Sequence, residues 1–242
     1  MARHAKEPVA VGDIDFDGIY SGGEAFAGMR FERVPWDFGG PQPALVGLER
    51  DGEIRGQVLD SGCGLGENAL FLAARGHRVT GLDAAAGAIE QARERAGSRG
   101  LDVEFAVADA TRFDGFEDRF DTIVDSALYH CLDSAQRTAY SAALHRVTRP
   151  GARLHLLCFS DAMPGTLPVG QDDLRTHLGG HWNIDRIDES RYSTSFTREI
   201  LRRQLADHDL GRIGLTFDPD ALDVDDEGRV LIPIWRLRAE RA

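Results

Sequence analysis

The stretch Val58-Leu59-Asp60-Ser61-Gly62-Cys63-Gly64-Leu65-Gly66 carries more information about the fold than any other part of this 242-residue chain. The apolar run Gln57–Asp60 leads directly into a loop with glycine at every second position, and Asn68–Ala74 then has the composition of a helix. Glycine permits positive φ angles and lets a ligand approach the main chain closely. A strand, a glycine loop and a helix in this order predict a ligand-binding turn at the end of a buried strand.

A regular alternation of strands and helices continues beyond the glycine loop. Strands that alternate with helices form parallel sheets with both faces covered, and right-handed crossovers make such sheets doubly wound. We therefore expect an α/β fold with a doubly wound, mostly parallel, seven-stranded sheet, of which Trp182–Tyr192 and Arg229–Leu237 form an antiparallel edge. The other expected elements are strands at Arg78–Leu82, Val103–Ala108, Phe120–Val124 and Arg153–Phe159, and helices at Ala85–Ala96 (ended near Gly97), Ser134–Thr148 (ended by Pro150-Gly151) and Gln171–Leu178.

Composition excludes several classes of protein. A formal net charge of -12 opposes binding to nucleic acids or anionic membranes. Lys6 is the only lysine, and it lies in an expected N-terminal tail. P-loop proteins and pyridoxal enzymes each need a lysine in the active site, so both classes are disfavoured. Three irregularly spaced cysteines predict neither a disulfide framework nor a zinc site, and favour a reducing, cytoplasmic compartment. No apolar run approaches the length of a membrane span.

The spacing of the glycines separates two classes of cofactor. A dinucleotide loop follows G-x-G-x-x-G so that pyrophosphate rests on the helix N-terminus, and the third glycine would here be Glu67. A carboxylate at that place would repel pyrophosphate, which disfavours an NAD(P) oxidoreductase. The pattern D-x-G-x-G-x-G from Asp60 to Gly66 instead resembles motif I of class I S-adenosylmethionine (SAM)-dependent methyltransferases, whose cofactor carries no phosphate.

Two further acids follow the next two expected strands. Asp83 lies where a carboxylate can accept hydrogen bonds from both hydroxyls of a ribose, a geometry that NAD sites share. The resemblance implies that Asp109 binds the adenine amino group with help from the main chain of Ala110, whereas the alternative for Asp109 is a helix N-cap or loop acid. The cofactor-binding residues that the resemblance implies are Trp36, Asp60, Gly62, Cys63, Gly64, Gly66, Asp83, Ala84, Asp109, Ala110 and Ser126, and no metal is expected.

The segment Pro35-Trp36-Asp37-Phe38-Gly39-Gly40-Pro41-Gln42-Pro43 resembles a P-W-D-x-G-x-P-x-P segment of methyltransferases of the thiopurine, thiol/halide and tellurite-resistance type. The resemblance implies that this segment lies against SAM, with Trp36 near the cationic sulfonium. The alternative is a buried tryptophan that anchors an N-terminal helix. We therefore expect residues 1–53 to form a tail and a helical cap over the cofactor, and residues 54–242 to form the SAM-binding domain, with an acceptor-side embellishment at 160–228.

The loop that follows the fourth expected strand, Ser126–Cys131, faces the methyl group and the acceptor in the family that the chain resembles. His130 is the candidate base, because imidazole titrates near neutral pH, with Tyr129 as a second candidate; the alternative for each is packing over the cofactor or a hydrogen bond to the main chain. The predicted function is methyl transfer by in-line displacement to a small-molecule, phenol- or quinol-like hydroxyl, with S-adenosylhomocysteine (SAH) as the product. The alternatives are methylation of thiols, halides or metalloids, or a non-catalytic SAM-binding regulatory domain; the oligomeric state is left open.

Overall fold

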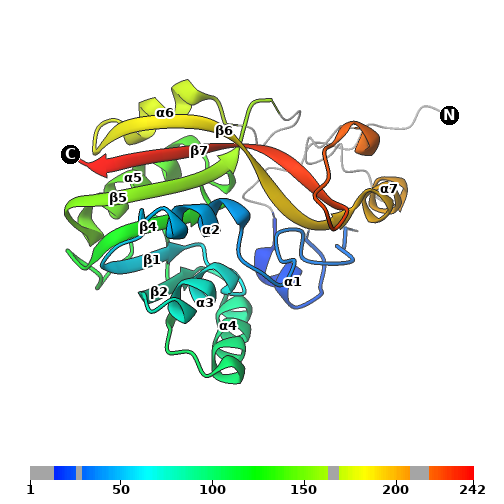
Figure 1. The fold of residues 1–242 in the computed structure, drawn as a ribbon, viewed down its shortest axis with the longest axis horizontal. Helices are drawn as coiled ribbons and strands as arrows, with labels where there is room; N and C mark the ends of the chain where they lie inside the picture. The colour runs from blue at the N-terminus through cyan, green and yellow to red at the C-terminus, as the bar shows by residue number, and fades with distance from the viewer. Residues whose placement is uncertain (1–13, 26–28, 163–168, 208–217) are drawn as a thin grey trace.

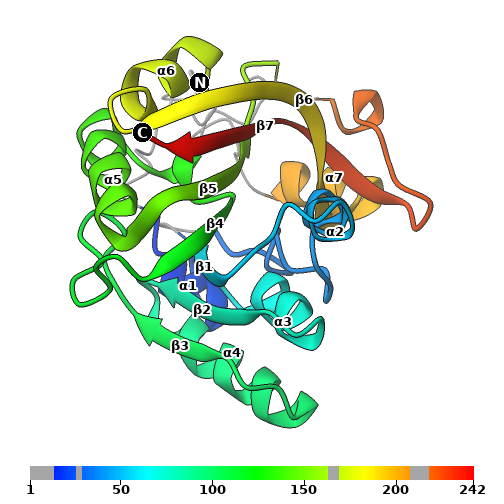
Figure 2. The same cartoon turned by 60° about the vertical axis from the view of Figure 1, so that its left-hand side comes forward.

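The centre of the computed structural model, which describes residues 14–25, 29–162, 169–207 and 218–242, is a seven-stranded sheet of order β3-β2-β1-β4-β5-β7-β6 (Figures 1 and 2). β1 to β5 are parallel, and β7 pairs antiparallel with both β5 and β6. The predicted doubly wound sheet with an antiparallel edge is confirmed. The strands are β1 (Gln57–Ser61), β2 (Arg78–Asp83), β3 (Glu104–Val107), β4 (Phe120–Ser126), β5 (Thr148–Phe159), β6 (Trp182–Thr197) and β7 (Arg229–Arg241).

Helices cover both faces of the sheet, because neighbouring residues of each buried strand point to opposite faces. Val58 packs into the core under α2, α3 and α4, whereas Leu59 packs into the core under α5 and α6. Figure 2 shows α5 and α6 on one side of the sheet and α2 and α3 on the other. The helices are α1 (Phe16–Tyr20), α2 (Pro43–Arg50), α3 (Glu67–Ala74), α4 (Ala86–Arg99), α5 (Ser134–Val147), α6 (Gln171–Leu178) and α7 (Arg198–Asp207).

The structure differs from the sequence-based expectation in several places: β6 and β7 extend to Thr197 and Arg241, and three other differences have a local explanation. α4 continues through Gly97 and ends at Arg99, and it is capped by Gly100, whose φ of 63° is the left-handed conformation that closes many helices. β5 begins at Thr148, before Pro150-Gly151, because its first residue already pairs with Phe120 across an irregularity in register. The segment after Phe196, which showed no clear pattern, contains α7.

The carboxyl ends of the parallel strands meet along one edge of the sheet. The strand order reverses at β1, which lies between β2 and β4, and open α/β sheets bind ligands beyond such a point. Figure 1 shows α1 and α7 beyond this edge. The glycine loop after β1 and the loops after β2, β3 and β4 therefore converge on one place, which α1 and α7 border.

Candidate active site

The glycine loop after β1 needs glycine for its backbone and for its neighbours. Gly62 has a φ of 70°, and a Cβ atom on it would lie 2.8 Å from the Cβ of Leu128. Gly66 has a φ of 83°, and a Cβ atom there would lie 2.8 Å from the ring of Phe105. Both positions combine a conformation that L-residues avoid with a close contact. The alternating glycines thus let the loop turn tightly between β1 and the first residue of α3.

Asp83, at the end of β2, holds the glycine loop. One of its carboxylate oxygens accepts a hydrogen bond from the amide of Gly64 at 2.8 Å, and the other accepts one from the amide of Ala85 at 2.9 Å. Burial raises the pKa of Asp83, and these two amides partly oppose that effect. A carboxylate oxygen accepts more than one hydrogen bond, so Asp83 can still receive hydroxyl groups from a ligand.

Asp60 is a buried acid whose charge lacks a partner. Its side chain is at the end of β1 with only 1% of the residue exposed. Neither carboxylate oxygen makes a hydrogen bond of ordinary geometry with the residues that the structure describes. Burial raises its pKa to about 7, and the amide of Ala69 only partly offsets this. A buried carboxylate in this state is costly, and a cationic ligand group such as an ammonium would relieve it.

A cavity of about 250 Å³ opens over the carboxyl ends of the strands. Its inner side carries Gly62, Asp83, Ala84, Ala110 and Ser126, where small side chains leave room for a flat ligand. Its outer side is built by aromatic and aliphatic residues of four segments, among them Phe16, Trp36, Phe159, Phe196, Val230 and Ile232. Asp83 is the only acidic side chain among the described lining residues, and none of them is a lysine or an arginine.

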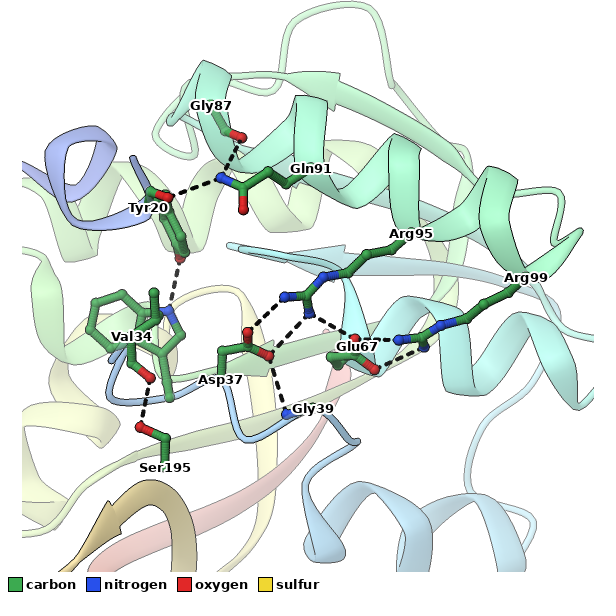
Figure 3. Close-up of polar contacts among 11 residues, drawn as sticks. Tyr20, Val34, Asp37, Gly39, Glu67, Gly87, Gln91, Arg95, Arg99 and Ser195 are labelled. Atoms are coloured by element: carbon green, nitrogen blue, oxygen red, sulfur yellow. Dashed lines mark hydrogen bonds and ion pairs between the residues drawn. The ribbon is translucent and has the colours of Figure 1, made fainter. Parts of the chain in front are cut away.

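The N-terminal cap (residues 14–25 and 29–42) is fastened to α4 and β6 by polar contacts, which Figure 3 shows. Nε1 of Trp36 donates to the hydroxyl of Tyr20 at 2.9 Å, and the carbonyl of Tyr20 accepts from Gln91 of α4 at 3.0 Å. The hydroxyl of Ser195 in β6 donates to the carbonyl of Val34 at 2.8 Å. Trp36 therefore lines the cavity and is bonded to the last residue of α1.

The cap also carries Asp37, which is paired with Arg95 of α4 at 2.8 Å. Arg95 and Arg99 also pair with Glu67 at the start of α3, at 2.7 and 2.6 Å. The carboxylate of Glu67 faces two guanidinium groups instead of the ligand cavity (Figure 3). The cap, α3 and α4 are thus joined in one network of charges.

The loop after β4 is positioned by a buried hydrogen-bond chain. Asp125 accepts from the amide of Leu128 at 2.9 Å and from the hydroxyl of Tyr140 at 2.9 Å, and Tyr140 in turn bonds with Ser61 at 2.8 Å. Burial raises the pKa of Asp125 to about 7. Ala127 has a φ of 83° in this loop. These hydrogen bonds connect β1, β4 and α5 to the loop that carries His130.

His130 lies in the cavity wall, with 4% of the residue exposed. Its ring stacks on that of Phe159 at 3.8 Å with an interplanar angle of 12°. The amide of Phe159 donates to Nδ1 of His130 at 3.4 Å. Burial, and then the positive charge of Arg137, lower the pKa of His130 to about 3. The imidazole is therefore neutral throughout the physiological range.

Tyr129 and Asp109 have other partners. The hydroxyl of Tyr129 donates to Asp173 of α6 at 3.2 Å, and the guanidinium of Arg137 lies over its ring at 5.0 Å. Tyr129 does not line the cavity, so we give it no part in the chemistry proposed below. Asp109 is exposed in a loop, and its carboxylate accepts from the amide and hydroxyl of Thr111 at 2.9 and 2.7 Å, so no helix N-cap is formed there.

The other expected residues divide into two groups. The cavity is lined by Gly62, Asp83, Ala84, Ala110, Ser126, Trp36 and His130, and it is not lined by Asp60, Cys63, Gly64 or Gly66. The cavity is also lined by Tyr20, Tyr192 and Phe159, which no sequence pattern predicted, because single aromatic residues in unremarkable surroundings carry no local signal. Across the described ranges, no His, Cys, Asp or Glu side chains gather as a metal site, and no helix is long and apolar enough to cross a membrane.

Comparison with known proteins agrees with this geometry. Residues 58–151 match a family model described as a methyltransferase domain. The chain is 41% identical over 165 residues to the 2-heptyl-1-hydroxyquinolin-4(1H)-one methyltransferase of Mycobacteroides abscessus, covering 66% of this chain and 73% of that protein. It is 27% identical over 129 residues to the probable thiol methyltransferase 2 of Arabidopsis thaliana, covering 52% of this chain and 57% of that protein.

A solved structure extends the likeness over nearly the whole chain. It was determined in work on the conversion of a disulfide bond into a thioacetal group during echinomycin biosynthesis. It is 36% identical, with a TM-score of 0.74, and the match covers 93% of this chain and 91% of that one. The protein belongs to the class I SAM-dependent methyltransferases. Within that class it is a methyltransferase of small molecules, and the predicted family, fold and cofactor are confirmed.

Proposed function

We propose that this protein transfers the methyl group of SAM to an ionised hydroxyl on a flat, apolar, aromatic small molecule. The observation that carries the proposal is the outer side of the cavity, where aromatic and aliphatic side chains predominate and none is charged. Such a wall favours an acceptor with a planar apolar ring system, because burial of apolar surface is the main driving force for binding. A permanently charged acceptor would lose its hydration there without compensation.

The inner side of the cavity fits SAM. The carboxylate of Asp83 would accept the ribose hydroxyls, and the unpaired carboxylate of Asp60 would lie below the cationic ammonium group of the methionine part. Ala84 and Ala110 leave space for the adenine ring, which Asp109 would reach only by exchanging its contact with Thr111. Trp36 lies on the outer side, where its indole would face the sulfonium.

The remaining residues of the predicted cofactor site act through the main chain or at its border. Gly62, Cys63, Gly64 and Gly66 shape the loop that approaches SAM, and Ser126 borders the loop that carries His130. SAM supplies a methyl group that is already activated by its positive sulfur. The protein therefore has to bind the two reactants and bring the acceptor oxygen to about 3 Å from the methyl carbon, in line with the bond that breaks.

An anionic oxygen suits this reaction in an apolar cavity. A carbon–oxygen bond forms, the carbon–sulfur bond breaks, and the charges of the oxyanion and the sulfonium disappear together, leaving a neutral ether and SAH. A site from which water is excluded strengthens the attraction between these charges. We therefore expect acceptors whose hydroxyl ionises near or below neutral pH. The relative from Mycobacteroides abscessus, named for a hydroxyquinolone with a heptyl chain, is consistent with such an acceptor.

Methylation of sulfur is the second candidate, because two of the similar proteins are named for sulfur chemistry. A thiol with a pKa of about 8.5 also presents an anion near neutral pH. Release of SAH by the purified protein, measured with matched hydroxyquinolone, phenol and thiol acceptors, distinguishes the candidates. Preference for the hydroxyquinolone supports our proposal, and preference for thiols overturns it. Calorimetric binding of SAM without SAH release from any acceptor would instead indicate a regulatory domain.

A further inference from the structure

The tautomer of His130 follows from its contact with β5. The main-chain amide of Phe159 donates to Nδ1, so Nδ1 contributes a lone pair and the single proton of the neutral ring lies on Nε2. Stacking on Phe159 fixes the plane of the imidazole ring. Because His130 is buried, water does not compete with the amide of Phe159 for Nδ1. His130 is therefore a hydrogen-bond donor at Nε2, with no free lone pair on either nitrogen.

We infer that His130 donates a hydrogen bond from Nε2 to the ionised oxygen of the acceptor, and does not remove its proton. This inference rests on the proposed function and concerns the same cavity. An oxyanion that enters an apolar cavity loses its hydration, and a donor in the wall restores one hydrogen bond. None of the described lining residues is a lysine or arginine that could take this part.

Burial and the positive charge of Arg137 oppose a second proton on the ring of His130. Arg137 of α5 is the charged group that acts on it, and this guanidinium is itself paired with Asp173 of α6 at 3.0 Å. Cys158 of β5, the ionisable group beside Phe159, is buried with a raised pKa and stays a neutral thiol. Asp83 lines the same cavity and is occupied by two main-chain amides. A ring without a free lone pair, next to a positive charge, is a poor base and a good donor.

The two roles predict different behaviour when His130 is replaced. His130→Gln retains an N–H donor and cannot act as a base, whereas His130→Phe retains the stacking on Phe159 and has neither function. A donor role predicts that Gln preserves most activity while Phe loses about tenfold or more in kcat/KM. A base role predicts that both variants lose activity alike, and that the loss vanishes at a pH where the acceptor is already ionised.

The first readout is ionisation of bound 4-nitrophenol, followed by its absorbance in the complex with SAH as the pH is varied. We expect the pKa of the bound phenol to be higher in His130→Phe than in the wild type by about one unit, and to remain near the wild-type value in His130→Gln. His77→Phe, at a histidine just before β2 that does not line the cavity, is the matched control. Equal pKa values in all four proteins would overturn the inference.

The second readout is the pH profile of SAH release with the most active acceptor of the panel. Loss in His130→Phe that persists above the pKa of the acceptor supports the donor role, and recovery there overturns it. Wild-type protein that binds SAM and releases no SAH contradicts the proposed function, whereas wild-type turnover with equal losses in the Gln and Phe variants contradicts only the inference. Calorimetric binding of SAM by each variant shows that it has folded.

Discussion

Both carboxylate oxygens of Asp37 accept hydrogen bonds from the guanidinium of Arg95, at 3.1 and 2.8 Å. This two-point contact joins the cap to α4 (Figure 3). Bidentate contacts of this kind are stronger and more directional than single ion pairs. The side chains of Asp37 and Arg95 are only 16% and 28% exposed, so the pair is partly shielded from water and salt. The cap must be in place for the cavity to be closed, and this pair favours that arrangement.

Loss of the Asp37 charge is expected to weaken SAM binding. In Asp37→Asn the contact with Arg95 becomes a neutral hydrogen bond, and we expect the Kd for SAM to rise about fivefold. Calorimetry at low and high salt is the measurement, and the difference between wild type and variant should shrink as salt rises. Asp114→Asn, which alters an exposed pair with Arg112, is the control. An unchanged Kd would show that the pair does not support the closed cap.

A methyl group at Gly62 is expected to damage the glycine loop. In Gly62→Ala the new Cβ meets Leu128 at 2.8 Å while φ is 70°, so we expect a loss of about 2 kcal/mol of stability and of most SAM binding. Gly47→Ala is the matched control. Gly47 lies inside α2 with nothing within 4 Å of an added Cβ, and this change should stabilise the protein by about 0.5–1 kcal/mol. Similar melting temperatures for the two variants would contradict the role assigned to the loop.

Asp60 is expected to make the cofactor-free protein less stable as the pH rises. Its folded pKa of about 7 lies above the value of about 3.9 in an unfolded chain, so its contribution is fully present below about pH 4 and is lost as the pH rises to about 7. Asp60→Asn removes this dependence, and the variant should exceed the wild type by about 1–2 kcal/mol above pH 7 while binding SAM more weakly. Thermal unfolding between pH 4.5 and 8 is the measurement.

The acid Asp125 provides an internal reference for that experiment, because its pKa is also raised to about 7 by burial and Asp60→Asn leaves it in place. The variant should therefore retain part of the decline of stability with pH. A wild-type melting temperature that is level across this range would show that neither carboxyl group is held protonated in the folded state. Stronger SAM binding by Asp60→Asn would contradict the proposed contact between the Asp60 carboxylate and the ammonium group of SAM.

Removal of the Tyr140 hydroxyl is expected to disturb the loop that holds His130. In Tyr140→Phe, Asp125 loses a hydrogen bond of 2.9 Å, and Ser61 loses its partner at 2.8 Å. Because all three groups are buried, we expect a loss of about 1–3 kcal/mol of stability and a higher KM for the acceptor. Ser61→Ala, which leaves the bond between Tyr140 and Asp125 intact, should cost less. Equal thermal stability of wild type and Tyr140→Phe would show that the hydrogen bonds of Tyr140 with Asp125 and Ser61 do not stabilise the protein.

Local patterns in the sequence were sufficient to predict the sheet and the class of cofactor. The glycine loop, the acid Asp83 and the alternation of strands with helices are each read within a few consecutive residues, because strand burial, positive φ and helix capping depend on near neighbours. The same limit explains the error at Pro150, because the start of β5 at Thr148 depends on its pairing with Phe120 of β4. At Gly97 the local signal was itself ambiguous, because a second glycine, Gly100, follows and caps the helix.

The tertiary structure decided the chemistry of the cavity. Tyr20 and Trp36 meet across 16 residues, Ser61 and Tyr140 across 79, and His130 and Phe159 across 29. The sequence by itself determined that a SAM-binding loop ends a buried strand. Whether His130 is a base or a donor depends on an amide that arrives from β5 and on burial that lowers its pKa, and both exist only after the chain has folded, because they arise from contacts between distant segments.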